Sequence, residues 1–229
     1  SDVDGFQTVG ADGVAADITF AQTGDGAVDV AGAIATNVEG SIDISVEMNQ
    51  LMVNADIEAL TATNDGTIDL DANSVWDNEM GDIIIGGATI GSQLGAITIT
   101  ADDDIIFTDV AAAVTSVGPD ADITITAATA ATADEVNDGD DGGIRVAAGV
   151  ADYTVEATAG TVLMTADESI ALGNVEATNS ADDPAIQLTS FSGAVNDING
   201  DTINLTANTV GAVVVIDAAM GVGSGDELE

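Results

Sequence analysis

Apolar and polar residues alternate in short runs along most of the chain. The recurring unit is an apolar residue, any residue, a second apolar residue, and then one or two small residues. Alternation of this kind buries one face of an extended strand, and a small inward residue after it suits a chain that turns a corner. The unit appears six times, at Ile68–Ala72, Ile97–Ala101, Ile123–Ala127, Ile144–Ala148, Val162–Ala166 and Ile203–Ala207.

Many of these predicted strands are followed by a second strand at a regular distance. In five places the two strands start 8 to 10 residues apart, at Ile18/Val28, Ile42/Leu51, Ile97/Ile105, Val162/Ile170 and Ile203/Val213. In three of them a further strand starts 16 to 18 residues later, at Ile68, Ile123 and Ile186. Ile97–Phe107 aligns with Val162–Leu172, and we expect the match to continue with Thr108–Ala112 over Gly173–Ala177.

Short strands, small polar corners and a repeat in the twenties predict an all-β protein, a parallel β-helix (β-solenoid) that forms one elongated domain over residues 1–229. We expect roughly nine or ten coils stacked at about 4.8 Å, a rod on the order of 45 Å long. The variable stretches Asp71–Met80 and Thr129–Gly143 would be loops at one corner. A β-sandwich also gives short alternating strands and is the alternative fold.

Charge changes this picture most. The chain has 41 acidic residues and one basic residue, Arg145, which gives a formal net charge of −40 at pH 7. Binding to nucleic acid or to anionic lipid needs Lys and Arg, so both are excluded. The folded chain has to tolerate self-repulsion unless salt or bound cations screen it. We therefore expect a prokaryotic protein in an extracellular or cell-surface setting rich in cations, although the same charge would also simply keep an apolar repeat protein soluble.

Most residue types that carry catalysis or transition-metal binding are missing. The chain has no Cys and no His, which excludes disulfides, thiolate chemistry and imidazole metal sites. Trp76 and Tyr153 are too isolated to form a sugar-binding platform, and Arg145 alone is expected to pair with a nearby Asp. We predict that the protein is not an enzyme. No apolar run approaches the roughly 18 residues that span a membrane.

Clusters of Asp at predicted corners are the candidate metal sites. Asp102–Asp104 and Asp167–Glu168 fall at equivalent corners of two repeats, and Asn137–Gly142 is an acidic loop interrupted by Gly. Carboxylate oxygens suit Ca²⁺, but Asp, Asn and Gly are also ordinary turn residues, so both interpretations stay open. The predicted calcium ligands are Asp102, Asp103, Asp104, Asp138, Asp140 and Asp141.

The tandem Ile-x-Leu-Thr-Ala units and the segment Ala219–Glu229 resemble large exported bacterial β-strand repeat proteins, namely filamentous-haemagglutinin-like adhesins and S-layer-type surface repeat proteins. The resemblance implies a right-handed parallel β-helix with a role in filaments, surface layers or adhesion. The C-terminal segment would also continue well into Ser1–Phe6, as in a unit cut from a longer repetitive chain or in subunits stacked end to end.

These features predict an extracellular structural protein that forms or extends a filament or surface layer. Stacked coils leave backbone hydrogen-bonding groups open at each end, and a head-to-tail contact between such ends makes open filaments rather than closed rings. The alternative is a calcium-dependent binding module of a surface adhesin, whose carbohydrate or cell-surface receptor the sequence leaves undefined.

Overall fold

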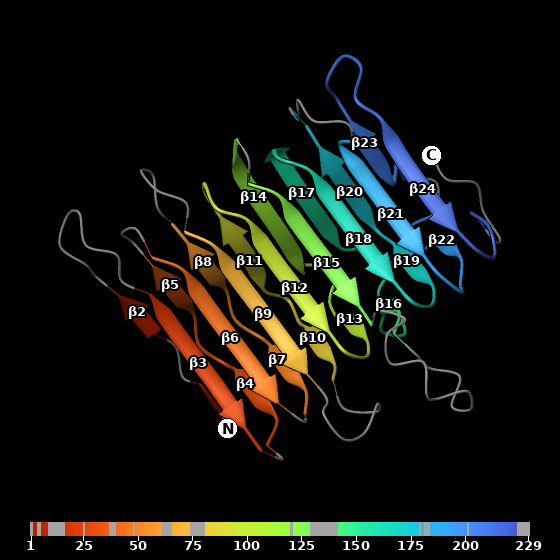
Figure 1. Cartoon of the computed structure of the whole chain (residues 1–229). Coiled ribbons are helices and arrows are strands. Elements are labelled where there is room, and N and C mark those ends of the chain that lie inside the picture. Colours follow the sequence, from red (N-terminus) through yellow and green to blue (C-terminus); the bar gives the residue numbers. More distant parts are fainter. Residues whose placement is uncertain are drawn as a thin grey trace.

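The chain winds as a stack of short strands in the computed structural model (Figure 1). The structure describes residues 2–3, 6–8, 17–24, 26–36, 40–47, 49–60, 66–73, 81–119, 121–128, 142–178, 180, 184–200 and 202–223. These residues form 24 strands in three sheets of eight, and the strands pair in parallel throughout. The predicted all-β parallel solenoid is thereby confirmed.

Each coil contributes one strand to each sheet, in the chain order A, B, C. Sheet A contains β1 (Asp2–Val3), β4 (Val28–Val30), β7 (Leu51–Val53), β10 (Ile83–Ile85), β13 (Ile105–Phe107), β16 (Ile144–Val146), β19 (Ile170–Leu172) and β22 (Val195–Asp197). Sheet B contains β2 (Phe6–Thr8), β5 (Ile34–Thr36), β8 (Ile57–Ala59), β11 (Thr89–Ser92), β14 (Ala113–Pro119), β17 (Thr154–Ala159), β20 (Asn174–Ala177) and β23 (Leu205–Ala207). Sheet C contains β3 (Ile18–Thr23), β6 (Ile42–Glu47), β9 (Ile68–Asn73), β12 (Ile97–Ala101), β15 (Ile123–Ala127), β18 (Val162–Ala166), β21 (Ile186–Ser190) and β24 (Val214–Ala218).

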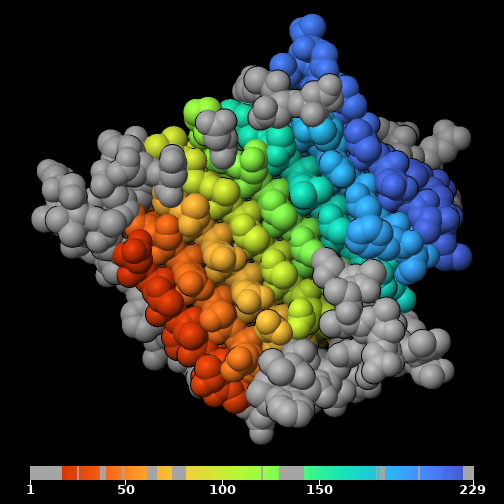
Figure 2. Space-filling view, in the orientation of Figure 1, coloured from red at the N-terminus to blue at the C-terminus, as the bar shows by residue number. Residues whose placement is uncertain are grey.

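The solenoid is right-handed. In Figure 1 the strands of sheet C lie in front and point to the lower right, while the coils advance to the upper right from the N-terminus to the C-terminus. This combination is the sense of a right-handed coil, the hand that connections between parallel strands almost always have. Figure 2 shows the same coils as successive bands from red to blue across the face of the molecule.

Alternation along each strand builds the core. In β12, Ile97, Ile99 and Ala101 are at most 1% exposed, whereas the two Thr residues between them are partly exposed on the outer face. Ile99 pairs in register with Leu70 in one direction and with Ile125 in the other. Inward residues of successive coils therefore form columns, and β-branched side chains pack well in them.

The coil count differs from the prediction. The described strands form eight coils, which at about 4.8 Å each span about 38 Å. Equivalent positions in sheet C lie 24 residues apart from Ile18 to Ile42, but 39 residues apart from Ile123 to Val162. A coil uses more residues than the repeat length suggested, because it contains three strands and, in some coils, a longer connection after sheet C. The chain therefore makes fewer coils than predicted.

The six copies of the recurring unit do not all belong to the same sheet. Four of its six copies are strands of sheet C, but Ile144–Val146 is β16 in sheet A. In the last copy only Leu205–Ala207 forms a strand, β23 in sheet B, and Ile203 precedes it with 58% of its surface exposed. All three sheets bury alternate residues in the same way, so the pattern identifies a strand without identifying its sheet.

The expected alignment of Thr108–Ala112 with Gly173–Ala177 is wrong. Val114 is the residue that pairs with Val155, which in turn pairs with Val175. Val110 instead lies 61% exposed in a turn between β13 and β14. The corner between sheets A and B is several residues longer in this coil than after β19, which shifts the register.

The two predicted variable loops both follow a strand of sheet C and precede a strand of sheet A. Asp71–Asn73 of the first belongs to β9, and residues 74–80 and 129–141 lie outside the described residues. Within the described residues, no helix is long and apolar enough to cross a membrane.

Candidate functional site

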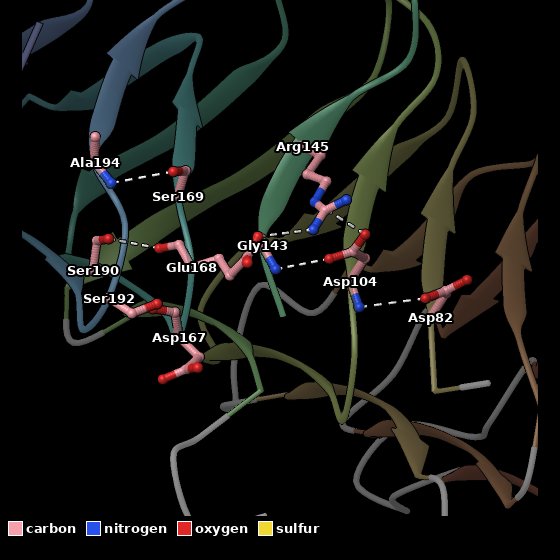
Figure 3. A network of polar contacts seen from close by, with 10 residues as sticks. All are labelled: Asp82, Asp104, Gly143, Arg145, Asp167, Glu168, Ser169, Ser190, Ser192 and Ala194. Atoms are coloured by element: carbon pink, nitrogen blue, oxygen red, sulfur yellow. Dashed lines mark hydrogen bonds and ion pairs between the residues drawn. The ribbon is translucent and has the colours of Figure 1, made fainter. Parts of the chain in front are cut away.

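The corner between sheets C and A carries a ladder of polar contacts that joins successive coils (Figure 3). Gln50 Nε2 donates to Asp82 Oδ2 over 2.6 Å, and the Asp104 N–H donates to Asp82 Oδ1 over 3.3 Å. One coil further, the Gly143 N–H donates to Asp104 Oδ1 over 2.7 Å. Each carboxylate thus accepts a backbone hydrogen bond from the next coil, which gives these buried acidic residues a structural role.

Toward the C-terminus, serine side chains make the hydrogen bonds between successive coils at this corner. Ser192 Oγ donates to the carbonyl of Asp167 over 2.9 Å, and the Ala194 N–H donates to Ser169 Oγ over 3.1 Å. The predicted equivalence of Asp102–Asp104 and Asp167–Glu168 is confirmed, because both follow a strand of sheet C and precede a strand of sheet A.

Three carboxylates converge within this ladder. One oxygen each from Asp82, Asp103 and Asp104 lies within 4.8 Å of the others. Asp82 and Asp104 are 8% and 6% exposed, and Asp103 is partly buried. Such a group offers the oxygen ligands that Ca²⁺ prefers. Asp82 was missed by the sequence reasoning, although it directly precedes β10 just as Asp104 directly precedes β13.

Arg145 supplies a positive charge to this cluster. Its Nε lies 3.1 Å from Asp104 Oδ2, and its Nη2 lies 3.0 Å from Glu168 Oε2. The predicted pairing of Arg145 with a nearby Asp is confirmed. The guanidinium of β16 bridges the corners before β13 and before β19, so one side chain ties three coils together.

Asp103 is the carboxylate whose ionisation the site changes most clearly. Its burial, and next the charges of Asp104 and Asp82, raise its pKa to about 7. The backbone N–H of Gly142 and the Arg145 guanidinium act in the opposite direction and lower the pKa. Near neutral pH this carboxyl is therefore partly protonated in the folded protein. A bound divalent cation would compete with that proton.

The predicted calcium ligands do not all meet. Asp103 and Asp104 join Asp82, whereas Asp102 is not part of that group and acts on another carboxylate, since its charge raises the pKa of Asp71. Asp138, Asp140 and Asp141 lie outside the described residues, as does Trp76.

Tyr153 is fully buried and stacks on Phe107 with ring centroids 3.9 Å apart. It therefore presents no aromatic platform at the surface, in line with the argument against a sugar-binding cleft.

Acidic residues of β6 and β9 lie together on the outer face of sheet C. Asp43 pairs in register with Asp69, and Asp71 lies two residues further along β9. Burial, followed by the charge of Asp43, raises the pKa of Asp69. Burial also raises the pKa of Asp71, with Asp102, Asp69 and Asp43 adding to the shift. Like charges stacked in neighbouring strands repel, and cations or protons relieve this repulsion.

The C-terminal end of the solenoid exposes residues that belong to the core columns. Val214 continues the column of Ile186 but is 37% exposed, and Ile216 continues that of Leu188 and is partly exposed. Val222 adds a single parallel bridge to Val195 beyond β22 and is 47% exposed. In the described residues no further strand covers β23 or β24, so their outer edges keep unpaired backbone groups.

The N-terminal end of sheet C is a matching edge. Among the described strands β3 pairs with β6 alone. Its inward residues Ile18, Phe20 and Gln22 occupy the same three columns as Val214, Ile216 and Ala218. The two ends of sheet C thus offer strands of the same direction and register.

The chain matches no protein-family model, no curated protein and no solved structure. Its function has to be inferred from the geometry and charge described above.

Proposed function

We propose that this protein is an extracellular structural solenoid that extends into a filament or surface layer by head-to-tail stacking of coils. The observation that carries the proposal is the open C-terminal end, where Val214 is exposed and Ile216 is partly exposed, although the strands from β6 to β21 bury the corresponding residues. Solenoids that remain monomeric cover such an end with a polar cap.

The occupant we propose for this end is the N-terminal coil of a second copy. β24 would pair in parallel with β3 of the next copy, placing Val214 on Ile18 and Ile216 on Phe20. Each pair extends an existing column of the core. The contact is heterologous, because two different ends meet, and it repeats without closing.

Charge favours this end-to-end contact over side-to-side association. The net charge of −40 repels other copies along the length of the rod. The exposed core residues at the C-terminal end are apolar, and burying apolar surface contributes about 25 cal/mol per Å². Cations that screen the shell would strengthen assembly, which fits an extracellular setting.

A pair of introduced cysteines tests the register. The chain has no Cys, so Thr19→Cys with Val215→Cys would form a disulfide only between two copies, since the two residues lie at opposite ends of the outer column of one chain. In-register strands bring the two Cα atoms to about 4.8 Å, within the range of a disulfide. We expect a ladder of disulfide-linked multimers on a non-reducing gel after mild oxidation.

The matched control is Ala21→Cys with Val215→Cys, which lies two residues out of register. Its Cα atoms would be about 8 Å apart, too far for a disulfide. Electron microscopy and sedimentation of the unmodified protein, with and without calcium, complete the test. Compact monomers at all concentrations, or equal cross-linking of both pairs, would overturn the proposal.

A second candidate function rests on the group Asp82, Asp103 and Asp104. If this group binds Ca²⁺, the solenoid would act as a calcium-dependent binding module of a surface adhesin. Asp103→Asn removes one ligand at the partly exposed side of the group. Unchanged calcium binding in that variant would argue against this candidate, and saturable binding that it abolishes would favour it.

A further inference from the structure

The last coil places a carboxylate in an apolar column. Asp197 of β22 pairs in register with Leu172, which is fully buried. In earlier coils of the same sheet the column holds Val30, Val53 and Ile85. An ionised carboxylate at such a position is costly unless its charge is compensated.

The compensation visible in the described residues is incomplete. Asn204 precedes β23 and is 0% exposed. Its Nδ2 donates to Asp197 Oδ1 over 3.0 Å and also to Leu172 O over 3.3 Å. Two buried oxygens, Asp197 Oδ2 and Asn204 Oδ1, have no hydrogen-bond partner among the residues that the structure describes. Buried oxygens without partners are uncommon in folded proteins, and a cation or a water molecule can satisfy them.

The amide of Asn199 shows the same excess of acceptors. Its Oδ1 accepts from Asn204 Nδ2 over 2.7 Å, but it also faces Asp197 Oδ1 at 2.9 Å and Thr202 O at 3.2 Å. Turning this amide over would satisfy the two oxygens but would set its nitrogen 2.7 Å from the Asn204 nitrogen. Turning both amides would then set the Asn204 oxygen against Leu172 O and Asp197 Oδ1. No orientation of the two amides satisfies every contact.

We propose that Asp197, Asn199 and Asn204, with the carbonyl of Thr202, form a calcium site at the corner between β22 and β23. Once the Asn204 amide is turned so that its oxygen, and not its Nδ2, faces Asp197 Oδ1, a cation turns the excess of oxygens into ligands. Carboxylate, amide and carbonyl oxygens are the set that Ca²⁺ prefers. The sequence Asp197-Ile-Asn-Gly-Asp201 agrees with the first three ligand positions of the EF-hand loop pattern. It departs from that pattern at the sixth position, Thr202, and at the twelfth, Asn208, so the site is not an EF-hand.

This site is distinct from the group around Asp103, since it lies at a different corner and in a later coil. It would hold the last coil on the one before it, because Asn204 also contacts Leu172 of β19.

The test compares Asp197→Asn with Asp217→Asn in the full chain. Both variants remove one carboxylate from the last coil, but Asp217 is exposed on the outer face of β24. Equilibrium dialysis against Ca²⁺ would be run at high NaCl, so that the net charge of −40 is screened. We expect Asp197→Asn to lose one saturable site, or to bind it at least about 10-fold more weakly, and Asp217→Asn to keep it.

Thermal unfolding separates a calcium site from a plain hydrogen-bond network. With a chelator, Asp197→Asn should unfold at a temperature equal to or above that of the unmodified chain, because a carboxylate with one buried, unpartnered oxygen is gone. With Ca²⁺, the unmodified chain should become the more stable of the two, and Mg²⁺ should substitute poorly because it dehydrates reluctantly. Asn199→Ala, on a partly exposed turn, gives a second variant that removes a ligand without touching the core column.

Equal numbers of saturable sites in Asp197→Asn and Asp217→Asn would overturn the proposal. So would a stabilisation by Ca²⁺ that both variants share in full, since that result indicates screening of the whole chain.

Discussion

The central coils and the C-terminal coil use the same kinds of residue but differ in what covers them. Ile99 and Ile125, in neighbouring central coils, are both 0% exposed. Ile216 lies in the same column at the C-terminal end and is partly exposed. Both regions have a strand in the same register, but among the described residues no further strand pairs with β24.

This difference shows that a coil does not complete its own core. Each inward side chain packs on the coil before it and the coil after it, so burial depends on neighbours rather than on residue type. Such a rod is stabilised by contacts between adjacent repeats, and its ends are the weakest part.

The largest expected effect comes from truncating the same column in both regions. Ile99→Ala should lower the free energy of unfolding by about 2–5 kcal/mol, because it leaves a cavity between two coils. Ile216→Ala should lower it by about 1 kcal/mol or less, since part of that side chain is already in water. Urea-induced unfolding of dilute protein, followed by circular dichroism, measures both.

Raising the protein concentration sharpens this comparison. If copies stack through β24 and β3, the loss caused by Ile216→Ala should grow with concentration, while that of Ile99→Ala stays constant. Equal losses in dilute protein would contradict the view that the last coil is uncovered.

A second test concerns the corner that Arg145 holds together. Arg145→Met removes the cation beside the buried Asp104 carboxylate and should lower the free energy of unfolding by about 1–3 kcal/mol, between a surface pair and a buried one. Arg145→Lys keeps the charge but cannot contact Asp104 and Glu168 at the same time through two nitrogens. Its free energy of unfolding should lie between those of the unmodified chain and of Arg145→Met. The exposed Asp217→Asn in the last coil should change stability little. A loss in Arg145→Met no larger than in Arg145→Lys would show that packing, not charge, matters there.

The fold was predictable from sequence because burial in a solenoid needs only alternation. The spacing of Ile97, Ile99 and Ala101 predicts a strand, and the repetition of this spacing along the chain predicts the stacked coils. The sheet that each copy joins was not predictable, because Ile144–Val146 and Leu205–Ala207 follow the same alternation in other sheets. The predicted register after the β13–β14 corner was also wrong, since a turn of variable length leaves no periodic signal in the sequence.

The candidate sites were harder to predict, because their residues come from different coils. Asp103 and Asp104 were visible as neighbours, but Asp82 reaches them only through the stacking of β10 on β13. Asp197 looks like a turn residue in the sequence. Its place on Leu172, in an apolar column, emerges only from the register.

A smaller effect is expected from the pH dependence of the central corner. The pKa of Asp103 is about 7 in the folded protein and 3.8 as its ordinary value, so the folded state binds more protons between these pH values. The free energy of unfolding should therefore fall as the pH rises from about 4 to about 7 and change little above that. Asp103→Asn should reduce this slope and stabilise the protein at pH 8. The raised pKa values of Asp69 and Asp71 act in the same direction, so part of the slope should remain.

The control for this prediction is Asp217→Asn, which removes the same charge from an exposed position. Unfolding temperatures measured from pH 4 to pH 8 should show the full slope in this control. A slope as steep in Asp103→Asn as in the control would rule out the burial of Asp103 as its cause.

The smallest expected effect is in a coil that is covered on both sides. Tyr153 stacks on Phe107 of the coil before, and its hydroxyl donates to the carbonyl of Ala171 in the coil after over 2.8 Å. Tyr153→Phe keeps the stack but leaves that carbonyl without its partner, and should lower the free energy of unfolding by about 1 kcal/mol. Phe107→Leu keeps the hydrogen bond but removes the stack, so the two variants separate the two contacts. Gly173 permits this close approach, since a Cβ there would lie 2.6 Å from the Tyr153 carbonyl oxygen. If urea unfolding shows no loss in Tyr153→Phe, this hydrogen bond adds nothing to the stability of the contact between these coils.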